Sequence, residues 1–240
     1  MKSSDLEKIV AERAAKRVFA LVTNLKSGEQ TVFYGKQNIN EFSFGSEIGL
    51  AAAAALDADE SGIAEAGGNR FFIQVHNPPL RLLIVGAVHI AQALAPMAAL
   101  TGYGVTIIDP RRAFATDSRF PDMAKSSAWP DEAMAELKPD RRTAVVTLTH
   151  DPKLDDPALE AALRSDAFYI GALGSRKTHA SRLARLMAAG FDEPALARIH
   201  GPVGLSINAE SPGEIAVSIL AQITAVRRQP PEAGSRDRAA

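Results

Sequence analysis

Residues 81–109 read RLLIVGAVHIAQALAPMAALTGYGVTIID, and this stretch carries the signal that decides the fold. Its first five residues have the continuous apolar character of a strand that is buried on both faces of a parallel sheet. Gly86 follows at once, a helix is predicted over 88–100, and a second apolar run over 105–108 ends at Asp109. A strand, a glycine turn, a helix and a strand in this order form the unit that opens a dinucleotide-type domain.

The alternation of strand and helix continues downstream of this unit. Further strands are predicted over 144–148 and 167–170, and further helices over 156–163, over 175–189 and from Pro212 onward. Such alternation implies a parallel sheet with right-handed crossovers. The predicted fold class is therefore α/β, with a Rossmann-like doubly wound parallel sheet over residues 80–228.

The first 77 residues follow a different pattern, which predicts a smaller N-terminal α+β domain. Its expected elements are helices over 1–14 and 45–56 and strands over 18–23, 31–34 and 70–76. Pro78 and Pro79 then interrupt both kinds of element, because proline lacks the backbone donor and restricts the preceding residue. We therefore expect a linker at 78–80. Residues 229–240, QPPEAGSRDRAA, are predicted to form a disordered tail.

Composition excludes several classes of function. The 27 basic and 28 acidic residues nearly cancel, so no broad basic footprint for nucleic acid or for an anionic membrane is expected. The chain contains no cysteine, which excludes disulfides, thiolate metal sites and a persulfide carried on this chain. The charged start of the chain does not resemble a signal peptide, and the apolar stretch near residues 90–100 is too short to span a bilayer. The expected location is the cytoplasm.

The glycine turn after the first strand is a candidate nucleotide site. A full dinucleotide fingerprint places glycine at positions 86 and 88 and glycine or alanine at 91, whereas this chain has Gly86, Val88 and Ala91. The valine argues against NAD(P), because the middle glycine normally lets the backbone approach a pyrophosphate. The helix N-terminus at His89 is still able to bind a phosphate. A vestigial nucleotide site, with His89 as a packing residue, is the alternative.

The end of the second strand offers two further candidates. Asp109 lies 23 residues after Gly86, near the spacing at which a carboxylate meets a ribose hydroxyl. Arg111, which is followed by Arg112, is a candidate phosphate ligand instead. After the next predicted strand, His150 is a candidate acid or base near neutral pH, with a capping turn and an exposed histidine as the alternative.

The segment GALGSRKTH at 171–179 closes one strand and opens a helix. Gly174, Ser175, Arg176 and Lys177 together resemble an anion site at a helix N-terminus. Cations there oppose the helix dipole by about 0.3–1 kcal/mol each, which favours a bound anion over an ordinary basic turn. The loop HGPVGLSINAE at 200–210 adds Gly204 as a further candidate, with a plain connecting loop as the alternative.

Three loops of this sequence, in the same order and at the same spacing, resemble those of a known family. The runs LLIVGAVHIAQALAPMAALTGYGVTIIDPR, YIGALGSRKTH and HGPVGLSINAESPGEIAVSIL are similar to the C-terminal Rossmann domain of the XdhC/CoxI family over about residues 79–226. The resemblance implies an accessory factor for a molybdenum hydroxylase such as xanthine dehydrogenase or carbon monoxide dehydrogenase. Such factors bind the molybdenum cofactor transiently, protect it, and assist its sulfuration and insertion.

The resemblance also implies partners. These are an apo molybdenum hydroxylase, a cysteine desulfurase, and either a second XdhC-type subunit or a second copy of this chain. The chain departs from the family pattern at Val88, in its lack of cysteine, and in the absence of Gly-Ser-x-Pro-Arg and Gly-Gly-Gly runs before residue 80. These departures suggest a shortened member that works beside a second subunit.

The sequence thus predicts a cofactor-maturation chaperone with no catalytic residue and no metal ligand of its own. Alternatives are an NAD(P)-dependent oxidoreductase and a non-catalytic protein-binding adaptor with a vestigial nucleotide site. The residues expected to bind the cofactor are Gly86, His89, Asp109, Arg111, His150, Gly174, Ser175, Arg176, Lys177 and Gly204.

Overall fold

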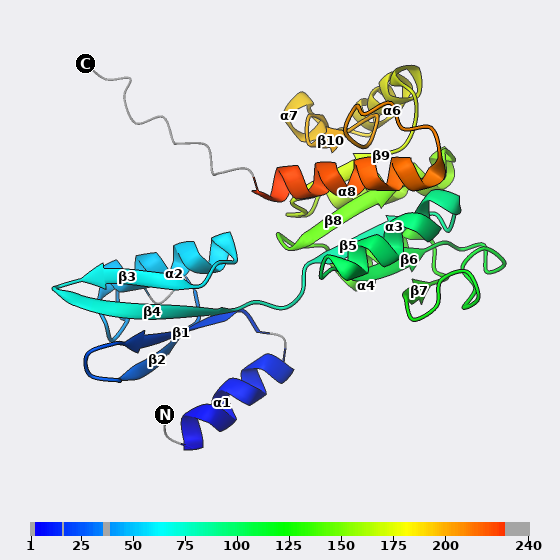
Figure 1. Ribbon diagram of the computed structural model, residues 1–240. Coiled ribbons are helices and arrows are strands. Elements are labelled where there is room, and N and C mark those ends of the chain that lie inside the picture. Colours follow the sequence, from blue (N-terminus) through cyan, green and yellow to red (C-terminus); the bar gives the residue numbers. More distant parts are fainter. Residues whose placement is uncertain (1–2, 16, 36–38, 229–240) are drawn as a thin grey trace, which may run out of the picture. The chain divides into compact units, whose positions relative to one another are not determined.

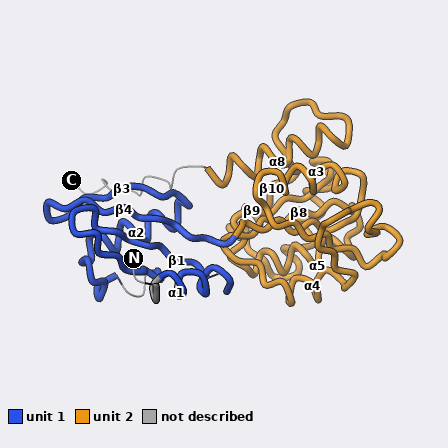
Figure 2. The backbone as a smooth tube through the Cα atoms, turned by 60° about the horizontal axis from the view of Figure 1, so that its bottom comes forward, with its two compact units in different colours: residues 1–78 blue, residues 79–240 orange. Residues whose placement is uncertain are grey.

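The computed structural model describes residues 3–15, 17–35 and 39–228 (Figure 1). The chain divides into two compact units, residues 1–78 and residues 79–240 (Figure 2). The tail predicted at 229–240 lies outside the described residues. Within those residues, no helix combines the length and the apolar character that crossing a membrane requires.

The N-terminal unit is a four-stranded antiparallel sheet in the order β2-β1-β4-β3. Its elements are α1 (Ser3–Ala14), β1 (Phe19–Asn24), β2 (Gln30–Phe33), α2 (Ser46–Ala58), β3 (Gly62–Ala66) and β4 (Asn69–His76). Alternation along β1 sends Ala20 and Val22 into a cluster with Ile48 of α2, while Phe19 and Leu21 pack with Ile9 of α1. The two helices therefore cover opposite faces of this sheet.

The C-terminal unit contains a six-stranded, wholly parallel sheet in the order β10-β9-β8-β5-β6-β7. Its strands are β5 (Arg81–Val85), β6 (Gly104–Ile108), β7 (Ala124–Ser126), β8 (Thr143–Thr147), β9 (Tyr169–Ala172) and β10 (Ile199–His200). Counted from β5, this is the order 6-5-4-1-2-3 of a Rossmann sheet. The predicted fold class is confirmed, and the order of the strands reverses between β5 and β8.

Helices cover both faces of this sheet. They are α3 (His89–Leu100), α4 (Pro130–Leu137), α5 (Pro152–Leu163), α6 (Arg176–Ala188), α7 (Glu193–Leu196) and α8 (Pro212–Arg228). Leu82 and Ile84 of β5 face the α3 and α8 side, where these two helices lie side by side (Figure 1). Leu83 and Val85 face the side of α4, α5 and α6. Each such fully buried side chain contributes about 1.5–3 kcal/mol, so the apolar RLLIV run is what fixes β5 at the centre.

Some boundaries differ from those that the sequence predicts. Helix α5 begins at Pro152 rather than near Asp156, because Asp151 caps it by accepting a hydrogen bond from the Lys153 amide at 3.0 Å. The pair Asp151-Pro152 carries the same cap-and-proline signal as Asp156-Pro157, one turn earlier. The short elements β3, β7, α4, α7 and β10 were not predicted, because segments of two to eight residues carry little periodicity.

We predict that a fragment beginning at Asn77 folds without the N-terminal unit. Every residue of the two hydrophobic clusters around the parallel sheet comes from after Pro79, so the fragment keeps its whole core. A single cooperative thermal transition, followed by circular dichroism, is the expected result. Insoluble material, or a broad non-cooperative transition, would contradict the domain boundary.

Candidate functional site

The turn after β5 packs directly against the loop after β8. Gly86 has a φ of 108°, and its amide donates to the Ile108 carbonyl oxygen at 2.9 Å. A Cβ atom added to it would lie 2.6 Å from Cγ2 of Thr149, so no larger residue fits there without rearrangement. The Thr149 methyl group thus lies against Gly86 between the ends of β5 and β8, where a Rossmann domain places its pyrophosphate.

Asp109 is fully engaged within the protein. Its side chain is 0% exposed, and its Oδ2 accepts hydrogen bonds from the Ala87 amide and from Nη2 of Arg111, both at 2.8 Å. Its Oδ1 accepts from the amide and Nε of Arg111 at 3.0 and 2.9 Å. Burial alone would raise the pKa of Asp109, but the hydrogen bonds from Arg111 and Ala87 outweigh it and the pKa is lowered. Asp109, the residue predicted to meet a ribose hydroxyl, thus links the glycine turn to the end of β6 through the Ala87 amide.

Arg111 also has a carboxylate partner already. Its side chain is 41% exposed, pairs with Asp109 and lies over the ring of Phe114, 4.6 Å from the ring centroid. The pKa of Arg111 is raised by the hydrogen bond to Asp109 above all, and further by the charges of Asp151 and Asp155. The loops after β6 and β8 are therefore electrostatically coupled.

The loop after β8 is organised by a buried carboxylate. Asp155, only 1% exposed, accepts three hydrogen bonds: from Oγ1 and the amide of Thr149 at 2.7 and 3.3 Å, and from the amide of His150 at 3.1 Å. These bonds hold His150 in the left-handed region, with a φ of 62°, and leave its imidazole exposed. Burial raises the pKa of Asp155 despite its hydrogen bonds.

A buried arginine faces this carboxylate from α6. Arg182 is 2% exposed, its Nη2 donates to the Leu173 carbonyl oxygen at 2.7 Å, and the same atom lies 3.7 Å from Oδ2 of Asp155. Its Nε and Nη1 are buried and have no hydrogen-bond partner among the described residues. Burial lowers the pKa of Arg182, and the charges of Asp155 and Asp156 oppose this shift.

The first turn of α6 forms as the sequence predicts. Ser175 caps the helix by accepting a hydrogen bond from the Thr178 amide at 3.1 Å. Gly174, with a φ of 142°, lies so close to Thr178 that an added Cβ would be 3.0 Å from its Cγ2. Arg176 and Lys177 are exposed and form no side-chain hydrogen bond or ion pair with the part of the chain that the structure describes. Two solvent-facing cations therefore stand at the N-terminus of this helix.

A pocket of about 240 Å³ joins the loop after β8 to α6. The β8 loop and the start of α5 contribute His150, Pro152 and Asp155; α6 contributes Lys177, Thr178, Ser181, Arg182 and Arg185. The structure thus brings together His150 and Lys177, two residues singled out from the sequence. Arg185 is already paired with Asp156, at 2.9 Å between Nη2 and Oδ1.

Of the residues predicted from the sequence to bind the cofactor, only His150 and Lys177 line this pocket, and His89 and Gly204 are among those that do not. His89 is exposed at the first position of α3. Gly204 donates its amide to Oε1 of Gln222 at 2.8 Å, and an added Cβ there would overlap the Ser218 side chain, so the residue seats its loop on α8. Gly171 is likewise packed, because an added Cβ would lie 2.6 Å from Cγ2 of Val203. The last two glycines have a packing reason.

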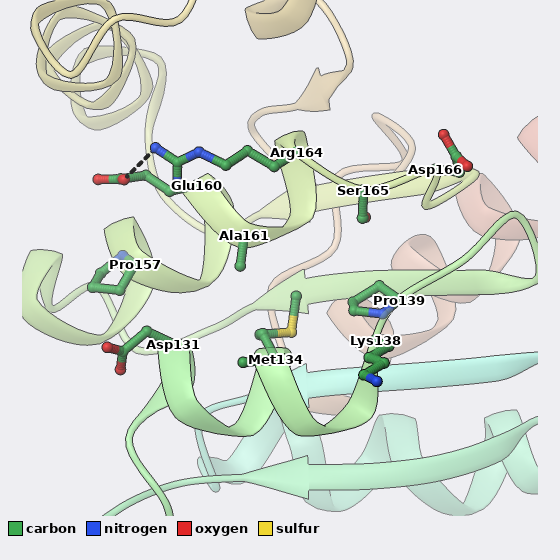
Figure 3. A pocket seen from close by; sticks show the side chains of 11 residues that line it. Asp131, Met134, Lys138, Pro139, Pro157, Glu160, Ala161, Arg164, Ser165 and Asp166 are labelled. Atoms are coloured by element: carbon green, nitrogen blue, oxygen red, sulfur yellow. Dashed lines mark hydrogen bonds and ion pairs between the residues drawn. The ribbon is translucent and has the colours of Figure 1, made fainter.

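The larger groove of the domain lies elsewhere. It has a volume of about 790 Å³ and runs between α4 and α5, with Lys138 and Asp166 at the end from which the strands β8 and β9 begin (Figure 3). Its charges are of both signs, and Glu160 and Arg164 pair with one another at 3.2 Å (Figure 3). Open α/β sheets place ligands beyond the carboxyl ends of their strands, and this groove extends toward the opposite edge. The smaller pocket is therefore the better candidate site.

Sequence reasoning missed Asp155 and Arg182. A signal for Arg182 was present, because it is four residues before Leu186 and so occupies the buried stripe of α6, where a charged residue is unusual. No such signal exists for Asp155, since an acidic residue in the first turn of a helix is ordinary. Among the described residues, no group of three or more histidine, aspartate or glutamate side chains is placed to hold a metal ion.

Comparisons with known proteins agree with this fold. The XdhC Rossmann domain family matches residues 82–223. Similar proteins include the molybdenum cofactor insertion chaperone PaoD of Escherichia coli, 36% identical over 62% of this chain, and a probable xanthine dehydrogenase subunit from Bacillus subtilis, 36% identical over 66%. The uncharacterized protein YqeB of E. coli is 34% identical over 72% of this chain. These matches span 41%, 46% and 32% of the respective relatives, so the chain corresponds to less than half of each.

A solved structure extends the likeness to both units. The crystal structure of a xanthine dehydrogenase from Bacillus halodurans aligns with a TM-score of 0.68 over 94% of this chain and 67% of that one. The sequence identity is 24%, so this likeness bears on the fold alone.

Proposed function

Because the chain belongs to the XdhC family, we propose that it is an accessory chaperone of a molybdenum hydroxylase, which binds the molybdenum cofactor and assists its sulfuration and insertion. The family match over residues 82–223 carries this proposal. The name of the relative PaoD, a molybdenum cofactor insertion chaperone, supports it. The cofactor is the cargo of such a protein rather than its resident group.

The cationic first turn of α6 and the adjoining pocket fit the phosphate that this cargo carries. Lys177 and Arg182 offer positive charge without a close carboxylate hydrogen bond, unlike Arg111 and Arg185. Charge-assisted hydrogen bonds to a phosphate are about twice as strong as neutral ones. In this role the chain holds and orients the cargo. The thiol chemistry of sulfuration falls to a partner, a cysteine desulfurase, because this chain has no cysteine.

An NAD(P)-dependent oxidoreductase fits the site less well. The Ala87 amide, which would face a pyrophosphate, already donates to Asp109, and Thr149 packs against Gly86. Val88 at the start of α3 adds a side chain at the position where the fingerprint has its middle glycine. A non-catalytic adaptor that binds only proteins would not explain why two buried donors of Arg182 have no partner among the described residues.

We predict that the full chain, purified under anaerobic conditions from cells that make the molybdenum cofactor, carries a pterin. Mass spectrometry of the released ligand, with fluorescence of its oxidised form, is the measurement. In a strain that lacks the chain, the client hydroxylase should be made but inactive, with normal protein level and low molybdenum and sulfido content. A nicotinamide in place of the pterin, or a fully active client in that strain, would refute the proposal.

A further inference from the structure

The guanidinium of Arg182 has more buried donors than the protein satisfies. Nε and Nη1 donate to no atom of the described residues, and only Nη2 is used, for the Leu173 carbonyl oxygen at 2.7 Å. Native proteins rarely leave buried charged donors unpaired, because the lost hydration is not replaced. The Asp155 carboxylate does not fill the gap, since its closest approach of 3.7 Å is too long for a hydrogen bond. The edge of the guanidinium that carries Nε and Nη1 is therefore held by no hydrogen bond from the described residues.

We propose that the pocket between the β8–α5 loop and α6 binds a phosphate group, and that Arg182 is its principal ligand. Arg182 lines this pocket together with Lys177, and its Nε and Nη1 have no hydrogen-bond partner among the described residues. Arginine suits the task because its planar fork matches two phosphate oxygens at once. Lys177 then contributes a second charge from the exposed rim.

The other charges around the pocket favour an anion. Asp155 is the acidic residue of the lining, and its carboxylate is turned to its own loop by the three hydrogen bonds from Thr149 and His150. Arg185 adds positive charge, although its ion pair with Asp156 partly neutralises that charge. The α6 helix, 13 residues long, directs the positive end of its dipole to this side.

The size of the pocket limits what enters it. A volume of about 240 Å³ is below the ~300–1,000 Å³ of pockets that enclose drug-sized ligands. The pocket therefore takes a phosphate and its ester oxygen, and the remainder of the molecule extends outside. The inference rests on the proposed function only for the identity of that remainder, a pterin; inorganic phosphate tests the pocket by itself.

Two exposed lysines provide a matched pair of variants. Lys177 lines the pocket, whereas Lys153, in the first turn of α5, does not. Calorimetric titration of the full chain with inorganic phosphate, at constant ionic strength set by chloride, should give a dissociation constant of about 1 mM or tighter. Lys177→Ala should weaken binding at least tenfold, whereas Lys153→Ala should change it less than twofold. Equal losses in the two variants, or no binding to the wild type, would overturn the proposal.

Arg182 itself requires a readout that does not depend on folding of a variant. Arg182→Lys keeps the charge opposite Asp155 but lacks the fork, so it should fold and bind phosphate at least tenfold more weakly. In the wild type, the Nε–H resonance of Arg182 should shift on phosphate addition. Arg198, whose guanidinium already donates to the carbonyl oxygens of Leu163, Ser165 and Ala167, is the internal control. An unchanged Arg182 resonance at saturating phosphate would rule the residue out as a ligand.

A pterin monophosphate, titrated in parallel, separates the two proposals. If inorganic phosphate binds in a manner that depends on Lys177 and the pterin monophosphate binds no more tightly, the phosphate pocket is supported and the proposed pterin cargo is refuted. Pterin binding that Lys177→Ala and Arg182→Lys do not weaken would support the cargo and place its phosphate elsewhere. If both proposals hold, the pterin monophosphate binds more tightly than phosphate and loses affinity in both variants.

Discussion

Replacing Arg182 with methionine is expected to lower the free energy of unfolding by about 3–5 kcal/mol at neutral pH. The substitution leaves the carboxyl group of Asp155 buried at 1% exposure without a counter-charge, and it removes the donor to the Leu173 carbonyl oxygen. Methionine fills a similar volume, so the loss comes from uncompensated polarity rather than from a cavity. Urea unfolding at neutral pH measures it.

The double variant Asp155→Asn/Arg182→Met is the control for this reading. Asp155→Asn by itself also costs stability, because its amide group presents a donor to the backbone amide of His150 or of Thr149. Once the carboxylate is gone, however, Arg182→Met leaves no buried charge without a partner, so the double variant should lose less than the sum of the two single variants, with a coupling energy of about 2–3 kcal/mol. Additive losses would show that Arg182 acts through packing alone.

The pH dependence of Arg182→Met has a defined sign. Burial raises the folded-state pKa of Asp155, so its ionised form destabilises the fold at neutral pH, and this penalty fades as the pH falls through the raised pKa toward the unfolded value. Loss of Arg182 raises that pKa further. The deficit of the variant relative to the wild type should hence shrink when the pH is lowered from about 7 to about 5. A deficit that grows on acidification would contradict it.

Replacing Asp109 with asparagine is expected to lower the free energy of unfolding by about 2–4 kcal/mol. Each carboxylate oxygen accepts two hydrogen bonds from N–H groups of Ala87 and Arg111. In asparagine an NH2 group replaces one of these oxygens, so N–H donors would face each other there and two hydrogen bonds would be lost. Because Ala87 is itself 0% exposed, water cannot take over its amide. Thermal and urea unfolding of the variant test this result.

The second readout for Asp109 is again pH. Its folded-state pKa is lowered, so its contribution to stability is present above the unfolded pKa and is lost as the pH falls through the folded one. The difference between wild type and Asp109→Asn should therefore disappear in acid. Arg111→Gln is the control; its side chain is 41% exposed, so it should lose less stability than Asp109→Asn. If the two variants lose the same stability, the loss comes from the Asp109–Arg111 ion pair rather than from the hydrogen bond of the Ala87 amide.

The central part of the fold could be predicted from the sequence because its signals are local. The RLLIV run gives β5 at Arg81–Val85 without a boundary error, since a glycine follows a wholly apolar strand. Strand β9 is displaced by two residues from the predicted range, because Ala167 and Phe168 continue the apolar pattern ahead of it. The edge strands β7 and β10, three and two residues long, are defined only by the neighbour with which they pair.

The site could be predicted only in part, for a related reason. Ser175 and Gly174 carry their roles in their own turn chemistry, and the sequence locates that turn correctly. The relation of Asp155 to Arg182 spans 27 positions and two helices, and no local pattern reports it. Asp109 was expected at the end of its strand and lies there, but only the structure shows that Arg111 turns back onto it and that Ala87 donates to it.

The packing of α8 against α3 also orders events during synthesis of the protein. Ala216, Ile219 and Ile223 of α8 belong to the same hydrophobic cluster as Leu82 and Ile84 of β5, more than a hundred residues earlier in the chain. While the ribosome is still translating the intervening residues, one face of β5 and α3 has no cover, and parallel strands pair slowly because their contacts are distant in sequence. The nascent domain thus exposes an apolar surface until α8 has left the exit tunnel. Its folding is completed only after that release.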